Sequence, residues 1–131
     1  MRIFLDTNVL ASALVSRGLC ADLFEVVLQS HELLISEPVL KELKRVLPEK
    51  LGQSQAITKS FISLLRAEAQ LITDEHTLPK LPDPEDEAIL ASALAGKAEV
   101  FVTGDKALLK LKTVETLPII APRSLWEMLA G

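Results

Sequence analysis

Apolar positions along the chain follow two different spacings. Short apolar runs predict buried strands at residues 2–5, 31–35, 100–102 and 119–120. Between these runs, apolar residues recur every three or four positions, a spacing typical of helices that bury one face. These helices are predicted at about 9–14, 19–28, 37–47, 53–70, 84–96, 106–111 and 122–129.

Strands that alternate with helices predict an α/β fold, a three-layer sandwich in which helices flank a mostly parallel central sheet. Connections in such a sheet are right-handed, and ligands gather at the carboxyl ends of its strands. A single domain over residues 1–131 is expected, because the chain shows no repeat and no linker that would divide it.

Polar residues and prolines mark where the predicted helices begin and end. Thr7 or Asn8 can cap the first helix and Ser36 can cap the third, whereas Pro48 helps to end the third helix. The prolines of segment 73–84 indicate the main loop. In the fourth helix, the residues predicted to face the core are Ile57, Phe61, Leu64 and Leu65.

Composition is that of a folded globular protein, with 49% apolar and 24% charged residues. The one cysteine, Cys20, cannot form an internal disulfide, and its apolar neighbours favour a buried small side chain over a reactive thiol. Asp6 and Asn8 interrupt the apolar start too early for a signal peptide, and no apolar run is long enough to span a membrane. We therefore expect a soluble, cytoplasmic protein with no membrane association.

Four acidic residues occupy positions that the predicted fold would bring together. Asp6 directly follows the first strand and Asp105 follows the strand at 100–102, so both lie at the carboxyl edge of the sheet. Asp86 lies in the first turn of a helix that starts at the same edge. Glu42 lies one to two turns into its helix, at the border of the buried stripe, and can extend toward the other three.

Carboxylates gathered in one pocket repel each other, and each close pair costs about 1–4 kcal/mol. The pocket therefore needs a cation, or some of its members must bind protons. Oxygen ligands of this kind suit Mg²⁺ or Mn²⁺, whereas His31, His76 and Cys20 form no zinc-ligand spacing. A metal held there can activate water against a phosphodiester, and it would reverse the local sign of a chain whose net charge is −4.

Each acid also has a structural interpretation. Asp83 can cap the helix that follows it, with Asp86 in the position of a capping box. Asp105 can cap the short helix after it, Asp6 can begin a turn, and Glu42 can be a solvated helix residue. The joint placement of the acids, rather than any one of them, indicates a metal site.

Four segments of the chain, taken together, resemble PIN-domain proteins. LDTNVL at 5–10 resembles the opening motif of that family, and SEPVLKEL at 36–43 resembles the helix that carries its second acid. DPED at 83–86 and VTGD at 102–105 resemble its third and fourth segments. The segments occur in the family's order over essentially the whole chain. Within the family, the chain is most similar to toxins of bacterial toxin–antitoxin modules of the VapBC kind.

The resemblance implies a Mg²⁺- or Mn²⁺-dependent endoribonuclease with an RNA substrate, a small antitoxin partner and self-association into a dimer or higher homo-oligomer. The acids that would hold the metal and carry catalysis are Asp6, Glu42, Asp86 and Asp105. Thr7 or Asn8 and Thr103 would orient these acids by hydrogen bonds, with Asp83 beside them. Asp83 and Glu87 are also close enough in sequence to take the place of Asp86.

Basic residues next to the acids are candidates for contact with RNA phosphates. They are Lys41, Lys44 and Arg45 near Glu42, and Lys106, Lys110 and Lys112 after Asp105. The alternative for both groups is an ordinary solvated helix face.

Two other functions remain open from the sequence. A phosphatase of the haloacid-dehalogenase kind would use Asp6 as its nucleophile, but Asn8 stands where its second acid is required. A catalytically inactive PIN-like scaffold would bind RNA or protein, and the presence of all four acids argues against it. A phosphoenzyme on Asp6 would indicate the first function, and RNA affinity indifferent to metal would indicate the second.

Overall fold

The computed structural model describes residues 1–78 and 80–130. The strands are β1 (Arg2–Leu5), β2 (Glu32–Ile35), β3 (Gln70–Leu71), β4 (Val100–Val102), β5 (Thr113–Val114) and β6 (Leu117–Ile120). The helices are α1 (Thr7–Val15), α2 (Leu19–Ser30), α3 (Glu37–Glu49), α4 (Gln55–Glu68), α5 (Pro84–Ala95), α6 (Lys106–Leu109) and α7 (Pro122–Ala130). Pro79, which belongs to the predicted main loop, lies outside the described residues.

The strands form one six-stranded sheet in the order β3-β2-β1-β4-β6-β5. Every neighbouring pair is parallel except β5 and β6, which are antiparallel. The predicted α/β sandwich with a mostly parallel sheet is therefore confirmed. The two-residue strands β3 and β5 were not predicted, because so short a segment has no apolar spacing of its own to recognise.

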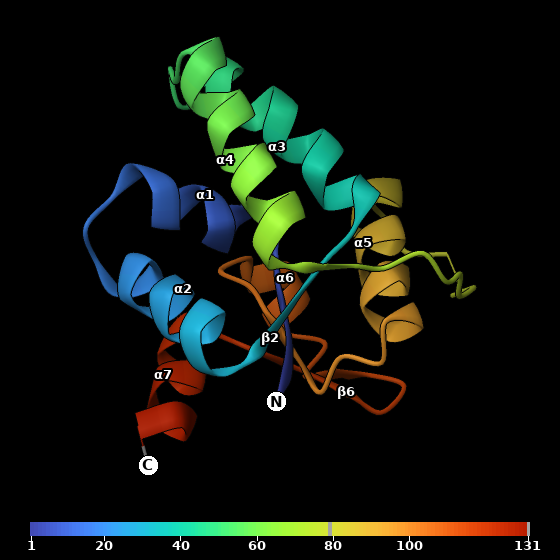
Figure 1. The fold of residues 1–131 in the computed structure, drawn as a ribbon. Helices are drawn as coiled ribbons and strands as arrows, with labels where there is room; N and C mark the ends of the chain where they lie inside the picture. The colour runs from blue at the N-terminus through green and yellow to red at the C-terminus, as the bar shows by residue number, and fades with distance from the viewer. Residues whose placement is uncertain (79, 131) are drawn as a thin grey trace.

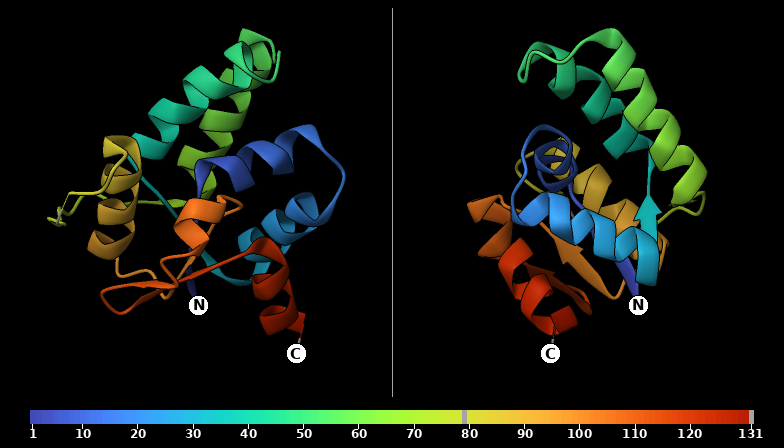
Figure 2. Two further views of the ribbon diagram at one scale, coloured as in Figure 1. Left: turned by 180° about the vertical axis from the view of Figure 1, so that it is seen from behind. Right: turned by 60° about the vertical axis from the view of Figure 1, so that its left-hand side comes forward.

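Helices lie on both sides of the sheet. The α2 and α7 helices pack together on one side, and α5 lies on the other (Figures 1 and 2). The α3 and α4 helices form a pair at the carboxyl edge of the central strands (Figure 1). The central strands are buried on both faces, and Phe4 of β1 stacks on Phe101 of β4 with ring centroids 5.3 Å apart.

The N-cap of the first helix lies one or two residues earlier than predicted. Asp6, rather than Thr7 or Asn8, is the N-cap of α1, and its carboxylate accepts a hydrogen bond from the backbone N–H of Thr7 at 2.8 Å. The prediction that Pro48 helps to end the third helix was also wrong, because this residue lies within the last turn of α3. The helix therefore continues to Glu49. Ser36 is the N-cap residue by position, as predicted, but within the described residues its side chain makes no capping hydrogen bond.

The prediction for the buried face of α4 was partly wrong. Ile57 is 46% exposed and Leu64 is 41% exposed, whereas Thr58 and Ile62 are buried. Both faces satisfy a spacing of three and four, so the pattern alone could not decide how the helix is rotated about its axis. The rotation leaves an apolar groove of about 330 Å³ between α1 and α4.

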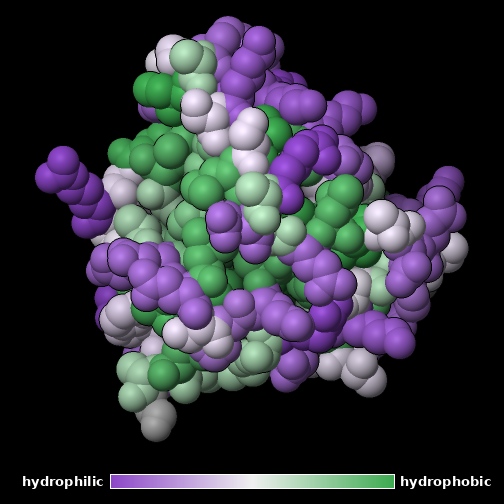
Figure 3. All heavy atoms as spheres, viewed as in Figure 1, coloured by the Kyte–Doolittle hydropathy of each residue, from purple (hydrophilic) through white to green (hydrophobic). Residues whose placement is uncertain are grey.

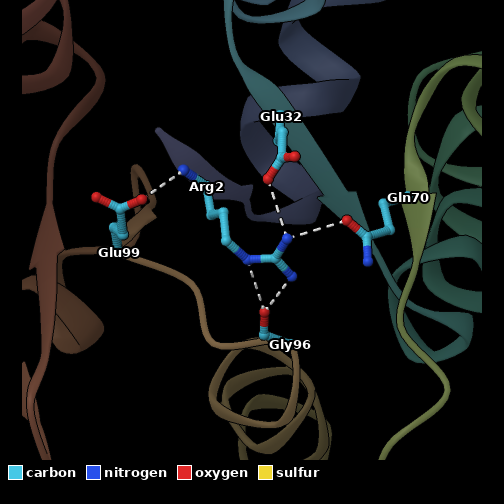
Figure 4. Close-up of polar contacts among 5 residues, drawn as sticks. All are labelled: Arg2, Glu32, Gln70, Gly96 and Glu99. Atoms are coloured by element: carbon cyan, nitrogen blue, oxygen red, sulfur yellow. Dashed lines mark hydrogen bonds and ion pairs between the residues drawn. The ribbon is translucent and has the colours of Figure 1, made fainter.

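Arg2 ties several segments together at the amino edge of the sheet (Figure 4). Its guanidinium donates hydrogen bonds to the carboxylate of Glu32 and the side-chain oxygen of Gln70, both at 3.0 Å, and to the carbonyl of Gly96. Gly96 ends α5 close to β3, where an added Cβ would lie 2.5 Å from the Ile72 side chain. This edge is opposite the carboxyl ends of the strands and is separate from the four acids.

Within the described ranges, no helix has both the length and the apolar character needed to cross a membrane.

Candidate active site

Asp6 lies directly after β1 at the carboxyl edge of the sheet and is only 5% exposed. Its carboxylate accepts hydrogen bonds from the hydroxyl of Thr103 at 2.8 Å and from the side-chain amide of Asn8 at 3.2 Å. Burial raises the pKa of Asp6, and these hydrogen bonds oppose the rise, while the charge of Asp105 adds to it. Asp6 is therefore a buried carboxylate that is held in place but is costly to ionise without a cation.

The side chains of Asn8 and Thr103 join the ends of β1 and β4. Asn8 donates from its amide nitrogen to the Thr103 hydroxyl at 3.2 Å and accepts from the backbone N–H of Gly104 at 2.9 Å. The Thr103 hydroxyl also accepts from the backbone N–H of Asp105 at 3.0 Å. These contacts place the loop that carries Asp105 beside Asp6.

Asp105 is the N-cap of α6, as its structural interpretation predicted. Its Oδ1 accepts hydrogen bonds from the backbone N–H groups of Ala107 at 2.8 Å and Leu108 at 3.4 Å. Both bonds use the same oxygen, so Oδ2 accepts no hydrogen bond from the residues that the structure describes and is available to a ligand. The charge of Asp105 raises the pKa of both Asp6 and Asp86, so capping a helix and facing the other acids are compatible.

Asp86 lies in the first turn of α5 and is half-buried. Its pKa is raised from 3.8 to about 6, mainly by burial and then by the charges of Asp83, Asp105 and Asp6. Asp83 and Glu87, the two residues that could take the place of Asp86, each accept a hydrogen bond from the backbone. Asp83 caps α5 by accepting from the backbone N–H of Glu85 at 2.9 Å, and Glu87 accepts from the backbone N–H of Leu81 at 3.0 Å.

Glu42 lies on α3, and its carboxyl group is affected by two other acids, Asp6 and Glu85. Burial raises the pKa of Glu42, and the charges of Asp6 and Glu85 raise it further, whereas the neighbouring Thr7 hydroxyl lowers it. Glu85 belongs to the DPED segment, but apolar spacing alone does not predict which side of α5 it occupies. The packing of α3 against α5 decides that Glu85 faces Glu42.

A groove of about 710 Å³ runs between α3 and α5 beside Glu42. Three of the proposed RNA-contact residues, Lys41, Lys44 and Arg45, line this groove, together with Glu85 on the opposite helix. Arg45 forms an ion pair with Glu85 at 3.3 Å. Lys106, a candidate from the second group, is exposed at the start of α6, next to Asp105.

The donor set fits Mg²⁺ or Mn²⁺ in its chemistry. Every candidate ligand is a carboxylate oxygen, and nearby negative charges raise the pKa of Asp6, Glu42 and Asp86, as expected for a site that a cation would neutralise. In the parts of the chain that the structure describes, no three His, Cys, Asp or Glu side chains are already arranged around one point that a metal could occupy. The acids are therefore electrostatic neighbours, and binding one ion would require their carboxyl groups to come closer together.

A family model described as the PIN domain matches residues 2–107. A crystal structure of VapBC2 from Rickettsia felis bound to a DNA fragment from their promoter is similar, with a TM-score of 0.67 over 92% of this chain and 98% of that chain. The sequences are 17% identical, so this likeness shows the fold alone. No curated protein sequence matches the chain.

Proposed function

The chain belongs to the PIN-domain family, and we therefore propose that it is a divalent-metal-dependent endoribonuclease. The observation that supports this proposal is that acids from separate segments lie near enough for the charge of one to raise the pKa of another. Asp6, from the end of β1, raises the pKa of Glu42 on α3 and of Asp86 on α5. Folding brings these negative charges together against their own repulsion, which a bound cation would relieve.

Asp6 and Asp105 would be the principal metal ligands, with Glu42 and Asp86 completing the site directly or through water. Mg²⁺ or Mn²⁺ bound there would polarise the scissile phosphodiester and lower the pKa of water. Thr103 and Asn8 keep the Asp6 carboxylate in one orientation through their hydrogen bonds. The reaction is in-line hydrolysis of RNA by water, with no covalent intermediate on the protein.

Basic side chains at the α3–α5 groove would hold the phosphates of RNA next to the acids. Lys41 and Lys44 are exposed on the groove wall, and Lys106 is exposed beside Asp105. Arg45 is the weaker candidate of the α3 group, because its guanidinium is already engaged by Glu85. Phosphate contacts of this kind position the strand and do not read its sequence.

The cellular role that we propose is the toxin of a toxin–antitoxin pair in the cytoplasm. The chain shares its fold with a structure of VapBC2 from Rickettsia felis, and its motifs resemble toxins of toxin–antitoxin modules of the VapBC kind. An apolar surface suitable for a small protein partner lies on α1 and α4, where Leu14, Ile57 and Leu64 line the groove and the last two are exposed. Figure 3 shows apolar side chains gathered on the face that carries these helices. Self-association into a dimer or larger oligomer is part of the same proposal.

The direct test is incubation of the purified protein with a structured RNA pool and Mn²⁺, with an excess of chelator as the metal-free control. We expect cleavage that needs the metal and is abolished in Asp6→Asn and Asp86→Asn. The Asp86 variant matters because Asp6→Asn also removes an acceptor from buried hydrogen bonds. Asp22→Asn, an exposed acid on α2, is the matched control that should retain full activity.

Three results would separate the proposed nuclease from its alternatives. Full activity in both Asp6→Asn and Asp86→Asn would contradict the site. RNA binding without cleavage, indifferent to metal and to both substitutions, would indicate an inactive scaffold. Transfer of phosphate to Asp6 would indicate a phosphatase.

A further inference from the structure

An ion pair connects the two walls of the α3–α5 groove. Arg45 on α3 donates from its Nη2 to Oε2 of Glu85, in the first turn of α5, at 3.3 Å. The two side chains are 44% and 61% exposed. An exposed ion pair of this kind adds little to folding stability, so its position suggests an effect on what binds in the groove.

A second acid of the groove forms an ion pair that is built differently. Glu37 accepts two hydrogen bonds from Arg66 of α4, at 2.8 and 3.1 Å. The exposed fractions of this pair, 41% for Arg66 and 59% for Glu37, nearly equal those of the first pair. Of these two residues, only Glu37 lines the groove. Arg66 therefore already holds a carboxylate through two bonds, a strong arrangement for a guanidinium, and it lies outside the groove.

Arg45, by contrast, has hydrogen-bond donors to spare. A guanidinium carries several N–H donors, and the side chain of Arg45 makes one hydrogen bond to the residues that the structure describes, the bond to Glu85. A phosphate held through two bonds would be a better partner than this carboxylate. Lys41 lies one turn before Arg45 on the same face of α3, so a strand that contacts Lys41 would bring its phosphates within reach of Arg45.

We propose that Glu85 controls the affinity for RNA by competing with RNA phosphates for Arg45. In the free protein, Glu85 holds the guanidinium and cancels one positive charge of the groove. When a strand binds along α3, a phosphate replaces the carboxylate and Glu85 is released. The inference rests on the proposed ribonuclease function, since the competing ligand is the phosphate backbone of the substrate.

The test measures affinity for a fluorescently labelled RNA oligonucleotide by anisotropy, with chelator present so that the strand is bound without being cleaved. Glu85→Gln should bind about 2–5-fold more tightly than the wild type, because an exposed ion pair no longer competes for Arg45. Glu37→Gln is the matched control, since it removes the same charge from the same groove but releases an arginine that lies outside it. Any gain in the control should be clearly smaller.

Substitution of Arg45 completes a double-mutant cycle. Arg45→Gln should remove most of the gain that Glu85→Gln produces, because no guanidinium is left to be released. The effects of these two substitutions on RNA affinity should therefore not be additive. The control cycle combines Glu37→Gln with Arg66→Gln and should be additive, since Arg66 lies outside the groove. All four side chains are exposed, so the variants should fold as the wild type does.

The outcomes distinguish this inference from the proposed function. Equal gains in Glu85→Gln and Glu37→Gln, or additive effects in the Arg45–Glu85 cycle, would overturn the competition and leave the proposed ribonuclease intact. Absence of RNA binding by the wild type in chelator would also overturn the competition, whereas cleavage with Mn²⁺ would still support the ribonuclease. Neither binding in chelator nor cleavage with Mn²⁺ would overturn both.

Discussion

At the scale of single residues, the acids of the site are held in place by different means. Asp6 is fixed by hydrogen bonds to its carboxylate, and Asp105 by the cap that its Oδ1 provides to α6. Asp86 accepts no hydrogen bond within residues 1–78 and 80–130, so its raised pKa is not offset by any donor. Asp86 is therefore the acid whose protonation should follow pH most simply.

The stability of the metal-free protein should depend on pH through Asp86. Its folded-state pKa of about 6 lies above its usual value of 3.8, so the folded state holds the proton more tightly than the unfolded chain does. This contribution to stability is present at low pH and is lost as pH rises through roughly 4 to 6. Relative to Asp86→Asn, the wild type should therefore become less stable as pH rises through that window. Urea unfolding of both proteins with chelator present measures the difference, and a constant difference across the window would contradict the assignment.

Metal binding should depend on the same proton. A ligand must be ionised to bind, so Mn²⁺ affinity should fall as pH decreases below about 6, where Asp86 takes up its proton. Titration calorimetry between roughly pH 5 and 8 measures this dependence. In Asp86→Asn, the residual binding should lose that part of the pH dependence. A variant that keeps the complete wild-type profile would show that another group controls binding.

At the scale of helices and strands, the sequence predicted most elements but not how each is rotated. The buried strands β1 and β4 and the helices α2 and α5 follow from apolar spacing and from boundaries such as Gly96. The rotation of α4 did not follow, because its sequence offers two apolar stripes of equal spacing. The same limit applied to Glu85, whose direction depends on how α3 and α5 pack and not on α5 alone.

Neighbouring leucines of α4 provide a matched test of that rotation. Leu65 is fully buried and Leu64 is 41% exposed, so the same substitution in the same helix should have different effects. Leu65→Ala should lower the free energy of unfolding by about 2–5 kcal/mol. Leu64→Ala should change it by no more than about 0.5 kcal/mol. Equal losses in the two variants, measured by urea unfolding, would mean that the helix is rotated differently.

Substitution of Arg2 should lower the stability of the protein without changing its affinity for metal. Its guanidinium connects β1 with β2, β3 and the end of α5 at the amino edge of the sheet. Arg2→Ala should cost about 1–3 kcal/mol of stability, since charged hydrogen-bond partners are lost. Because the acids lie at the opposite edge, Mn²⁺ affinity should be unchanged. A large loss of affinity in a folded Arg2→Ala protein would contradict this separation.

At the scale of the whole molecule, the parallel sheet explains why acids so distant in sequence become neighbours. Asp6 and Asp105 are 99 positions apart, and they meet because β1 and β4 are adjacent and end at the same edge. The sequence was enough to predict that Asp6 and Asp105 lie at the same edge of the sheet. It also allowed the hypothesis that these acids bind a metal ion. The orientation of the carboxyl groups could not be predicted, since it depends on side-chain packing and, for Glu42, on which of its neighbours it faces.

The most direct test of the central claim is the position of Mn²⁺ in crystals of the protein, located by its anomalous scattering. We expect a peak at the carboxyl edge of the sheet, in contact with Asp6 and Asp105 and with Glu42 and Asp86 turned toward it. No peak between these acids at saturating Mn²⁺, or a peak held only by residues elsewhere in the chain, would contradict the account.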